Sequence, residues 1–140
     1  MADGIIFEGF PELNAAFDAA TQAVLDANVV SVRKGAALVE ASAKRHASGR
    51  PGPNVVSGSH RRSFNVTGPT VSGTTVAALV GPSMIYSRRL ELGYVGADSL
   101  GRVYNQPPFP SLTPAVSDTQ DELKELFTEG WRAALEPFSS

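Results

Sequence analysis

Cysteine is absent from this chain of 140 residues, and histidine occurs only twice. The lack of cysteine excludes disulfide bonds, thiolate zinc sites and a cysteine nucleophile, and it fits a reducing cytosol or a particle assembled inside one. His46 and His60 lie beside Lys or Arg, and neither has Asp, Glu or another His at a spacing typical of a metal site. We therefore expect no metal ion.

Long apolar runs are also missing. No uninterrupted stretch approaches the ~18 residues of a membrane-spanning helix, and MADGIIFEGF at the start lacks the basic flank and apolar core of a signal peptide. No glycine-rich phosphate loop ends in Lys-Ser/Thr, and GYVGADSLG (93–101) lacks the preceding buried strand of a dinucleotide site. The sequence thus predicts a protein that is not an enzyme, binds no cofactor and spans no membrane.

Acidic and basic residues are unevenly distributed. Residues 33–102 hold ten of the twelve Lys and Arg but only three acids, a net charge of +7. Residues 1–32 hold five acids and no base, and residues 103–140 hold six acids and two bases. Three interpretations stay open: ordinary solvated charge, a basic face for a polyanion, or contact between the acidic end of one subunit and the basic middle of the next.

The length fits one domain, so we interpret 1–140 as a single α+β unit. Residues 11–46 are rich in alanine and helical in pattern, with Pro11 suited to a first turn. The β-branched run NVVSV (28–32) and Gly35 indicate a bend or a break within this helical region, or a helix that presents different faces to different partners. Glycine and proline then alternate, which predicts a flexible basic loop over 47–62.

Region 63–106 is expected to hold a small antiparallel sheet. Two β-leaning runs, 63–67 and 74–80, predict a strand pair joined by a broad turn. A short helix should follow, with Met84 or Ile85 facing the core, and Gly93 should end it. The stretch 94–106 has weak periodicity and indicates a loop or a loose hairpin.

The proline-rich segment PPFPSLTPAV (107–116) precedes the last helical pattern. Prolines at 107, 108 and 110 fix φ and remove backbone donors, so this strap should run extended, with Phe109 and Leu112 as anchors and Pro114 in a first helical turn. A terminal helix is expected over 117–136, with Ser117 or Asp118 as its cap. Its apolar face, which should close the core, contains Leu123, Leu126, Phe127, Trp131 and Leu135.

The order of these motifs resembles the neck and tail-completion family of long-tailed bacteriophages. The matching residues are Ser57, Gly58, Ser63, Gly81, Pro82, Tyr86, Leu90, Glu91, Gly93, Pro107, Pro108, Pro110, Leu112, Pro114 and Ala115. The chain departs from the family pattern at Leu92, Phe109, Ser111 and Thr113, where the family usually has Phe, Arg, Phe and a basic or polar residue. The resemblance implies an α+β fold with a long N-terminal helix, a small antiparallel sheet and a C-terminal amphipathic helix.

The resemblance also implies a structural virion protein of the head-tail interface, assembled in the cytoplasm of a host bacterium. Its partners would be copies of itself in a homo-oligomeric ring, expected to be a hexamer, and adjoining neck and tail proteins: a connector or stopper, a tail terminator or the tail tube. Double-stranded DNA would pass through the ring without sequence-specific contacts. Three alternatives stay open: a tail terminator of the same neck, a small non-specific nucleic-acid-binding protein and a hydrolase of unrecognised type.

Two groups of residues are candidates for these contacts. The candidates for a subunit or ring interface are Arg88, Arg89, Glu91, Tyr94, Tyr104 and Phe109. Within this group, Glu91 is expected to pair with Arg88 or Arg89, within or between subunits, rather than to act as a general acid or base. The candidates for contact with DNA or an adjoining ring are Lys44, Arg45, Arg50, Arg61 and Arg62, and contact with a ring is the favoured reading.

Overall fold

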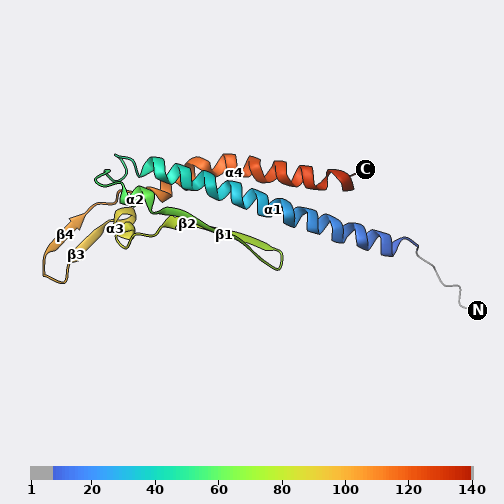
Figure 1. The fold of residues 1–140 in the computed structure, drawn as a ribbon, viewed down its shortest axis with the longest axis horizontal. Coiled ribbons are helices and arrows are strands. Elements are labelled where there is room, and N and C mark those ends of the chain that lie inside the picture. Colours follow the sequence, from blue (N-terminus) through green and yellow to red (C-terminus); the bar gives the residue numbers. More distant parts are fainter. Residues whose placement is uncertain (1–7, 140) are drawn as a thin grey trace, which may run out of the picture.

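Helix α1 (Phe10–His46) is the longest element of the computed structural model, which describes residues 8–139 (Figure 1). Pro11 lies in its first turn, where its missing N–H costs nothing, and Glu12 lies near the positive end of the helix dipole. At 1.5 Å per residue the 37 residues of α1 extend about 55 Å. The predicted break is wrong, because α1 continues without interruption through NVVSV and Gly35.

Helix α4 (Leu112–Leu135) runs antiparallel to α1 along its C-terminal part, and a 3₁₀ turn, η1 (Glu136–Phe138), follows it (Figure 1). The buried residues of the two helices are small: Ser31, Gly35, Ala36, Ser42, Ala43, Ala115 and Thr119. A Cβ on Gly35 would lie 2.7 Å from Leu123 Cδ2, so the absence of a side chain there allows α4 to lie close. This close packing explains why a glycine does not interrupt α1.

The start of α4 corrects the sequence prediction. The helix begins at Leu112 after the N-cap residue Ser111, so Ser117 and Asp118 are internal residues and not caps. Pro114 does lie in the first turn, as expected. Leu112 packs against the core, which confirms its role as an anchor of the strap.

A short helix α2 (Ser59–Arg62) leads into an antiparallel hairpin of β1 (Phe64–Ser72) and β2 (Thr75–Pro82), which lies along α1 (Figure 1). The predicted strand pair is confirmed, but its strands are longer than expected and a tight turn at Gly73 and Thr74 replaces the broad one. The register runs from Phe64 opposite Pro82 to Ser72 opposite Thr75, with an irregularity between Thr67 and Thr70. Gly68 and Pro69, which fall in the predicted broad turn, therefore lie inside β1.

Beyond this hairpin the chain forms helix α3 (Ser87–Leu92) and a second antiparallel pair, β3 (Tyr94–Ala97) and β4 (Val103–Gln106). The short helix is confirmed, and the uncertain stretch 94–106 is a regular hairpin. Ile85 is 100% exposed, so the expectation of a core position fails for it, whereas Met84 is half-buried. The strap, α3 and this hairpin lie at the end of the molecule opposite the N-terminal turns of α1 (Figure 1).

The described part of the chain has a small core. Phe64 is the largest side chain in a buried cluster with Ala43, Ala47 and Ala115. The accessible surface of the chain is 9840 Å², whereas a compact monomer of 14.7 kDa exposes about 6,900 Å². The fold is α+β as predicted, but its elongated shape leaves much apolar surface exposed.

Candidate functional site

Glu91 on α3 caps the N-terminus of α4. Its Oε2 accepts hydrogen bonds from the backbone N–H groups of Ser111 at 2.8 Å and Leu112 at 3.1 Å. Its Oε1 accepts two more from Thr113, one from the backbone N–H at 2.7 Å and one from the hydroxyl at 2.8 Å. The first N–H groups of a helix have no partner within the helix, so this carboxylate satisfies donors that would otherwise be unpaired.

These hydrogen bonds set the protonation state of Glu91. Burial raises the pKa of the carboxyl, but the hydrogen bonds from Ser111, Thr113 and Leu112 outweigh burial, so its pKa lies below the ordinary value. The expected pairing of Glu91 with Arg88 or Arg89 within the subunit is wrong. Both carboxylate oxygens are used by the α4 terminus instead.

A second backbone contact joins the strap to α3. The N–H of Phe109 donates a hydrogen bond of 2.6 Å to the carbonyl of Leu90, the residue before Glu91. Gly93 ends α3 at φ 76°, and a Cβ there would lie 2.8 Å from the carbonyl oxygen of Gln106 and 3.0 Å from the nitrogen of Pro108. Only glycine suits this position, since both the backbone angle and the space exclude a side chain.

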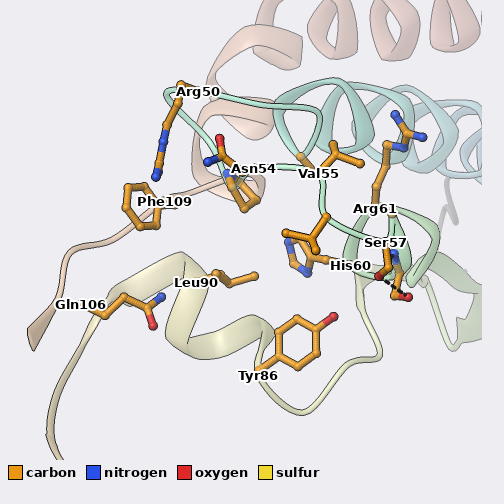
Figure 2. Close-up of a pocket in the computed structure, with 15 residues that line it drawn as sticks. Arg50, Asn54, Val55, Ser57, His60, Arg61, Tyr86, Leu90, Gln106 and Phe109 are labelled. Atoms are coloured by element: carbon orange, nitrogen blue, oxygen red, sulfur yellow. Dashed lines mark hydrogen bonds between the residues drawn. The ribbon is translucent and has the colours of Figure 1, made fainter. Parts of the chain in front are cut away.

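A groove of about 430 Å³ lies between the 47–62 region on one side and α3 with the proline strap on the other (Figure 2). Its apolar wall includes Val55, Val56, Tyr86, Leu90 and Phe109. Its polar lining includes Arg50, Asn54, His60, Arg61 and Gln106. We call this the apolar groove; it combines aliphatic and aromatic side chains with basic residues at its edge.

Phe109 lies half-buried in this groove rather than in the core. The guanidinium carbon of Arg50 sits 3.8 Å from the centre of its ring, at the distance of a cation–π contact (Figure 2). The sequence predicted Phe109 as an anchor that pins the strap to the sheet. The structure instead shows it against a residue of the 47–62 loop.

His60 is the half-buried histidine of the groove. Its Nδ1 lies 3.1 Å from the hydroxyl of Ser87, and its ring packs edge-on against Phe64 at a centroid distance of 5.2 Å. Burial lowers the pKa of His60, and the negative charge of Glu91 opposes this only in part. His60 is therefore a neutral packing residue between α2, α3 and β1 at physiological pH.

Four of the five predicted DNA or ring contacts come together around a separate hollow. Lys44, Arg45, Arg61 and Arg62 line it with Ala41 and Ser48, and we call it the basic hollow. Lys44 also forms an ion pair of 2.7 Å with Glu40, and Arg61 donates a hydrogen bond of 3.3 Å to the hydroxyl of Ser48. Arg50 lies apart from the hollow, over Phe109.

The predicted tyrosines meet on the β3–β4 hairpin. The rings of Tyr94 and Tyr104 lie 6.4 Å apart, and Arg89 stacks over Tyr94 at 4.0 Å. Asp98 holds the turn, because its carboxylate accepts hydrogen bonds from Leu100, Arg102 and Tyr104. The backbone N–H of Arg102 is the largest of the causes that lower the pKa of Asp98.

Sequence reasoning missed the roles of Glu91 and Asp98. Glu91 acts on residues about twenty positions later, so no local capping pattern announces it. Asp98 precedes Ser99 and Gly101 in a turn-like stretch, and this composition was a usable signal for an Asp that binds its own turn.

The remaining chemistry of residues 8–139 is sparse. Within these residues no three His, Asp or Glu side chains gather in a way that could hold a metal ion, and no helix is long and apolar enough to cross a membrane. The chain matches no family model, no curated protein and no solved structure. The resemblance to phage neck proteins therefore depends on the sequence motifs alone.

Proposed function

We propose that this chain is a structural protein of the neck of a long-tailed bacteriophage, where copies of it form a ring that joins the DNA-filled head to the tail. The ring is expected to contain six copies, and its neighbours are a connector or stopper on one side and a tail terminator or tail tube on the other. The work of such a protein is binding and shape, with no catalytic turnover.

The surface of the subunit is the observation that carries this proposal. The chain exposes about 2,900 Å² more than a compact monomer of its mass, and large apolar side chains are among what it exposes. A subunit in a ring has two faces, and a standard interface removes about 800 Å² from each partner. The excess surface is large enough for both faces, as an assembly subunit requires.

The arrangement of the motifs that carry the resemblance supports the same proposal. Leu90, Glu91 and Gly93 belong to one motif, and Pro108 and Leu112 belong to the other. In the structure the two motifs form one hydrogen-bonded unit through Phe109 and Glu91. Both carboxylate oxygens of Glu91 accept hydrogen bonds in this unit, so we assign Glu91 a structural role rather than that of a proton donor.

The basic hollow favours one second candidate, a small non-specific nucleic-acid-binding protein. Its Lys and Arg side chains can contact phosphates, and phosphate contacts carry no sequence information. Duplex binding through this hollow would therefore be weak, independent of sequence and sensitive to salt. In the neck such a surface would contact passing DNA or an acidic face of an adjoining ring.

Electron microscopy of the purified protein, together with native mass spectrometry, tests the main proposal. We expect closed rings of uniform copy number with a central channel that passes a DNA duplex. A protein that stays monomeric at all concentrations and binds unrelated duplexes with equal, salt-sensitive affinity would replace this proposal with the second candidate.

A phage that carries the gene allows the decisive test. Deletion of the gene should leave filled heads and complete tails that do not join, and complementation should restore infectious particles. Antibody labelling should place the protein at the head-tail joint. Normal virions after deletion would contradict the proposal.

A further inference from the structure

We propose that copies of this chain associate head to tail, with the apolar N-terminal end of α1 in one copy against the apolar groove of the next. This inference rests on the proposed ring and identifies the two surfaces that meet. The occupant of the groove is thus a second copy of this chain.

The first surface is an apolar end formed by α1 and the last turn of α4. Leu13 and Phe17 are one helical turn apart on one face of α1 and are 48% and 63% exposed. Phe17 and Leu135 line a hollow of about 300 Å³ together with Val24 and Leu25. The N-terminal turns of α1 extend beyond the ends of α4 and of the β1–β2 hairpin (Figure 1), and Leu135 of α4 and Thr74 of the hairpin turn reach the apolar end only at this hollow.

The second surface surrounds the apolar groove at the opposite end of the molecule. Val56 lines the groove and is 96% exposed, and Tyr86 and Val55 beside it are also exposed. Figure 2 shows Val55, Tyr86 and Leu90 around the same opening. Exposed apolar side chains that surround a cavity are typical of a docking surface for another apolar face.

Charge selects which surfaces pair. Glu12 and Asp18 flank the apolar side chains of α1, and Glu136 follows Leu135 on the neighbouring terminus, so the apolar end has a net negative charge even with Arg132 in the last turn of α4. Arg50 and Arg61 line the groove, which makes it basic. Two apolar ends would repel each other, as would two grooves, whereas one of each is complementary.

Geometry requires that the two surfaces belong to different copies. About 50 Å of continuous helix separates Leu13 from His46, at the end where the groove lies. A rigid helix cannot fold back to bring its own ends together. A contact between unlike surfaces of identical subunits is heterologous, and such contacts generate a ring when the rotation between subunits closes.

Site-directed cross-linking tests this pairing, and the absence of native cysteine makes each introduced thiol unique. Phe17→Cys protein is mixed with Val56→Cys protein and treated with a short bismaleimide linker. Ala19→Cys is the matched control, because Ala19 is exposed and lies on the other side of α1 from Phe17. Since docked residues meet at effective concentrations of order mM, we expect about tenfold more mixed dimer from Phe17→Cys than from Ala19→Cys.

The outcomes separate this inference from the proposed function. Closed rings without the Phe17–Val56 cross-link would leave the ring proposal standing and overturn the head-to-tail pairing. Equal cross-linking from Ala19→Cys, or a predominance of Phe17–Phe17 dimers, would also overturn it. The mixed cross-link in a protein that phage assembly does not require would support the pairing and reject the neck function.

Discussion

Thr113 donates two hydrogen bonds to one oxygen of Glu91, from its backbone N–H at 2.7 Å and from its hydroxyl at 2.8 Å. A carboxylate on α3 therefore does for α4 what a neighbouring Ser or Asp usually does for a helix. This contact fixes the start of α4 relative to α3.

Replacement of Glu91 by Gln should destabilise the protein by about 1–2 kcal/mol, because the neutral amide keeps one acceptor oxygen and loses the charge at the helix terminus. Trp131 is the single tryptophan and donates a hydrogen bond of 2.6 Å to Asn28, so its fluorescence reports on the α1–α4 contact during urea unfolding. Glu122→Gln, at an exposed position of α4, is the control. Equal midpoints for the two variants would contradict the capping role.

The contribution of Glu91 should depend on pH. Its folded-state pKa lies below the ordinary value, so the unfolded chain binds the proton more readily and stability rises with pH across this interval. The difference in unfolding free energy between wild type and Glu91→Gln should be constant well above about pH 4.3 and shrink as the pH falls through the folded-state pKa. Urea titrations of both proteins from pH 6 to about pH 3 measure this difference. A difference that stays constant to the lowest pH would contradict the assignment.

Gly35→Val should separate α1 from α4. A Cβ at this position already approaches Leu123 at 2.7 Å, and two further methyl groups would add overpacking that costs about 1–3 kcal/mol. Ala37→Val controls for helix propensity, because Ala37 is exposed on the same helix. We expect a larger loss of thermal stability for Gly35→Val. A similar loss in both variants would mean that the close contact between Gly35 and Leu123 does not contribute to thermal stability.

Phe109→Ala should cost about 1–3 kcal/mol, less than the ~3–5 kcal/mol of a fully buried ring, because Phe109 is half-buried against Arg50. Arg50→Gln removes the cation–π contact alone and should cost about 0.5–1 kcal/mol. Thermal unfolding of the monomer measures both. An unchanged melting temperature with failed ring assembly would show that Phe109 acts between subunits instead.

Double substitution of Arg61 and Arg62 by Ala should weaken DNA binding uniformly across sequences. If each side chain contacts one phosphate, the slope of log K against log salt should decrease in magnitude by about 1.8. Fluorescence anisotropy with two unrelated duplexes over a salt series measures this slope. Arg88→Ala serves as the control, since Arg88 is exposed and lies outside the basic hollow. Equal loss in both proteins would show that the hollow is not the contact surface.

Local sequence patterns predicted which helices and strands form better than they predicted where each one begins and ends. Alanine content and Pro11 predicted α1, and alternating β-branched residues predicted the hairpin of β1 and β2. The break near Gly35 was wrong because the glycine serves the contact with Leu123, a residue far along the chain. The start of α4 was misplaced for the same reason, since its cap comes from Glu91.

The candidate surfaces combine residues from different elements, and local sequence patterns do not show which of these residues lie close together. The sequence indicated a basic segment that includes Lys44, Arg61 and Arg62. Their common hollow depends on how α2 lies against α1. Ile85 and Val56 are apolar, yet their side chains are exposed rather than buried. Apolar character favoured a core position for Ile85 in the sequence, although exposed apolar residues of this kind are candidates for contact with another copy.

The small residues between α1 and α4 have a mechanical consequence. Glycine, alanine and serine allow the helices to lie close, and Leu123 of α4 lies over Gly35 of α1, where a Cβ would be 2.7 Å from its Cδ2. The position of α4 along the axis of α1 is held by this packing and by two polar contacts near the ends of α4, Trp131 with Asn28 and His46 with Asp118, each at 2.6 Å. In the proposed ring, a load on the strap would act along α4, and a shear of α4 along α1 would have to displace Leu123 from Gly35 and break both polar contacts.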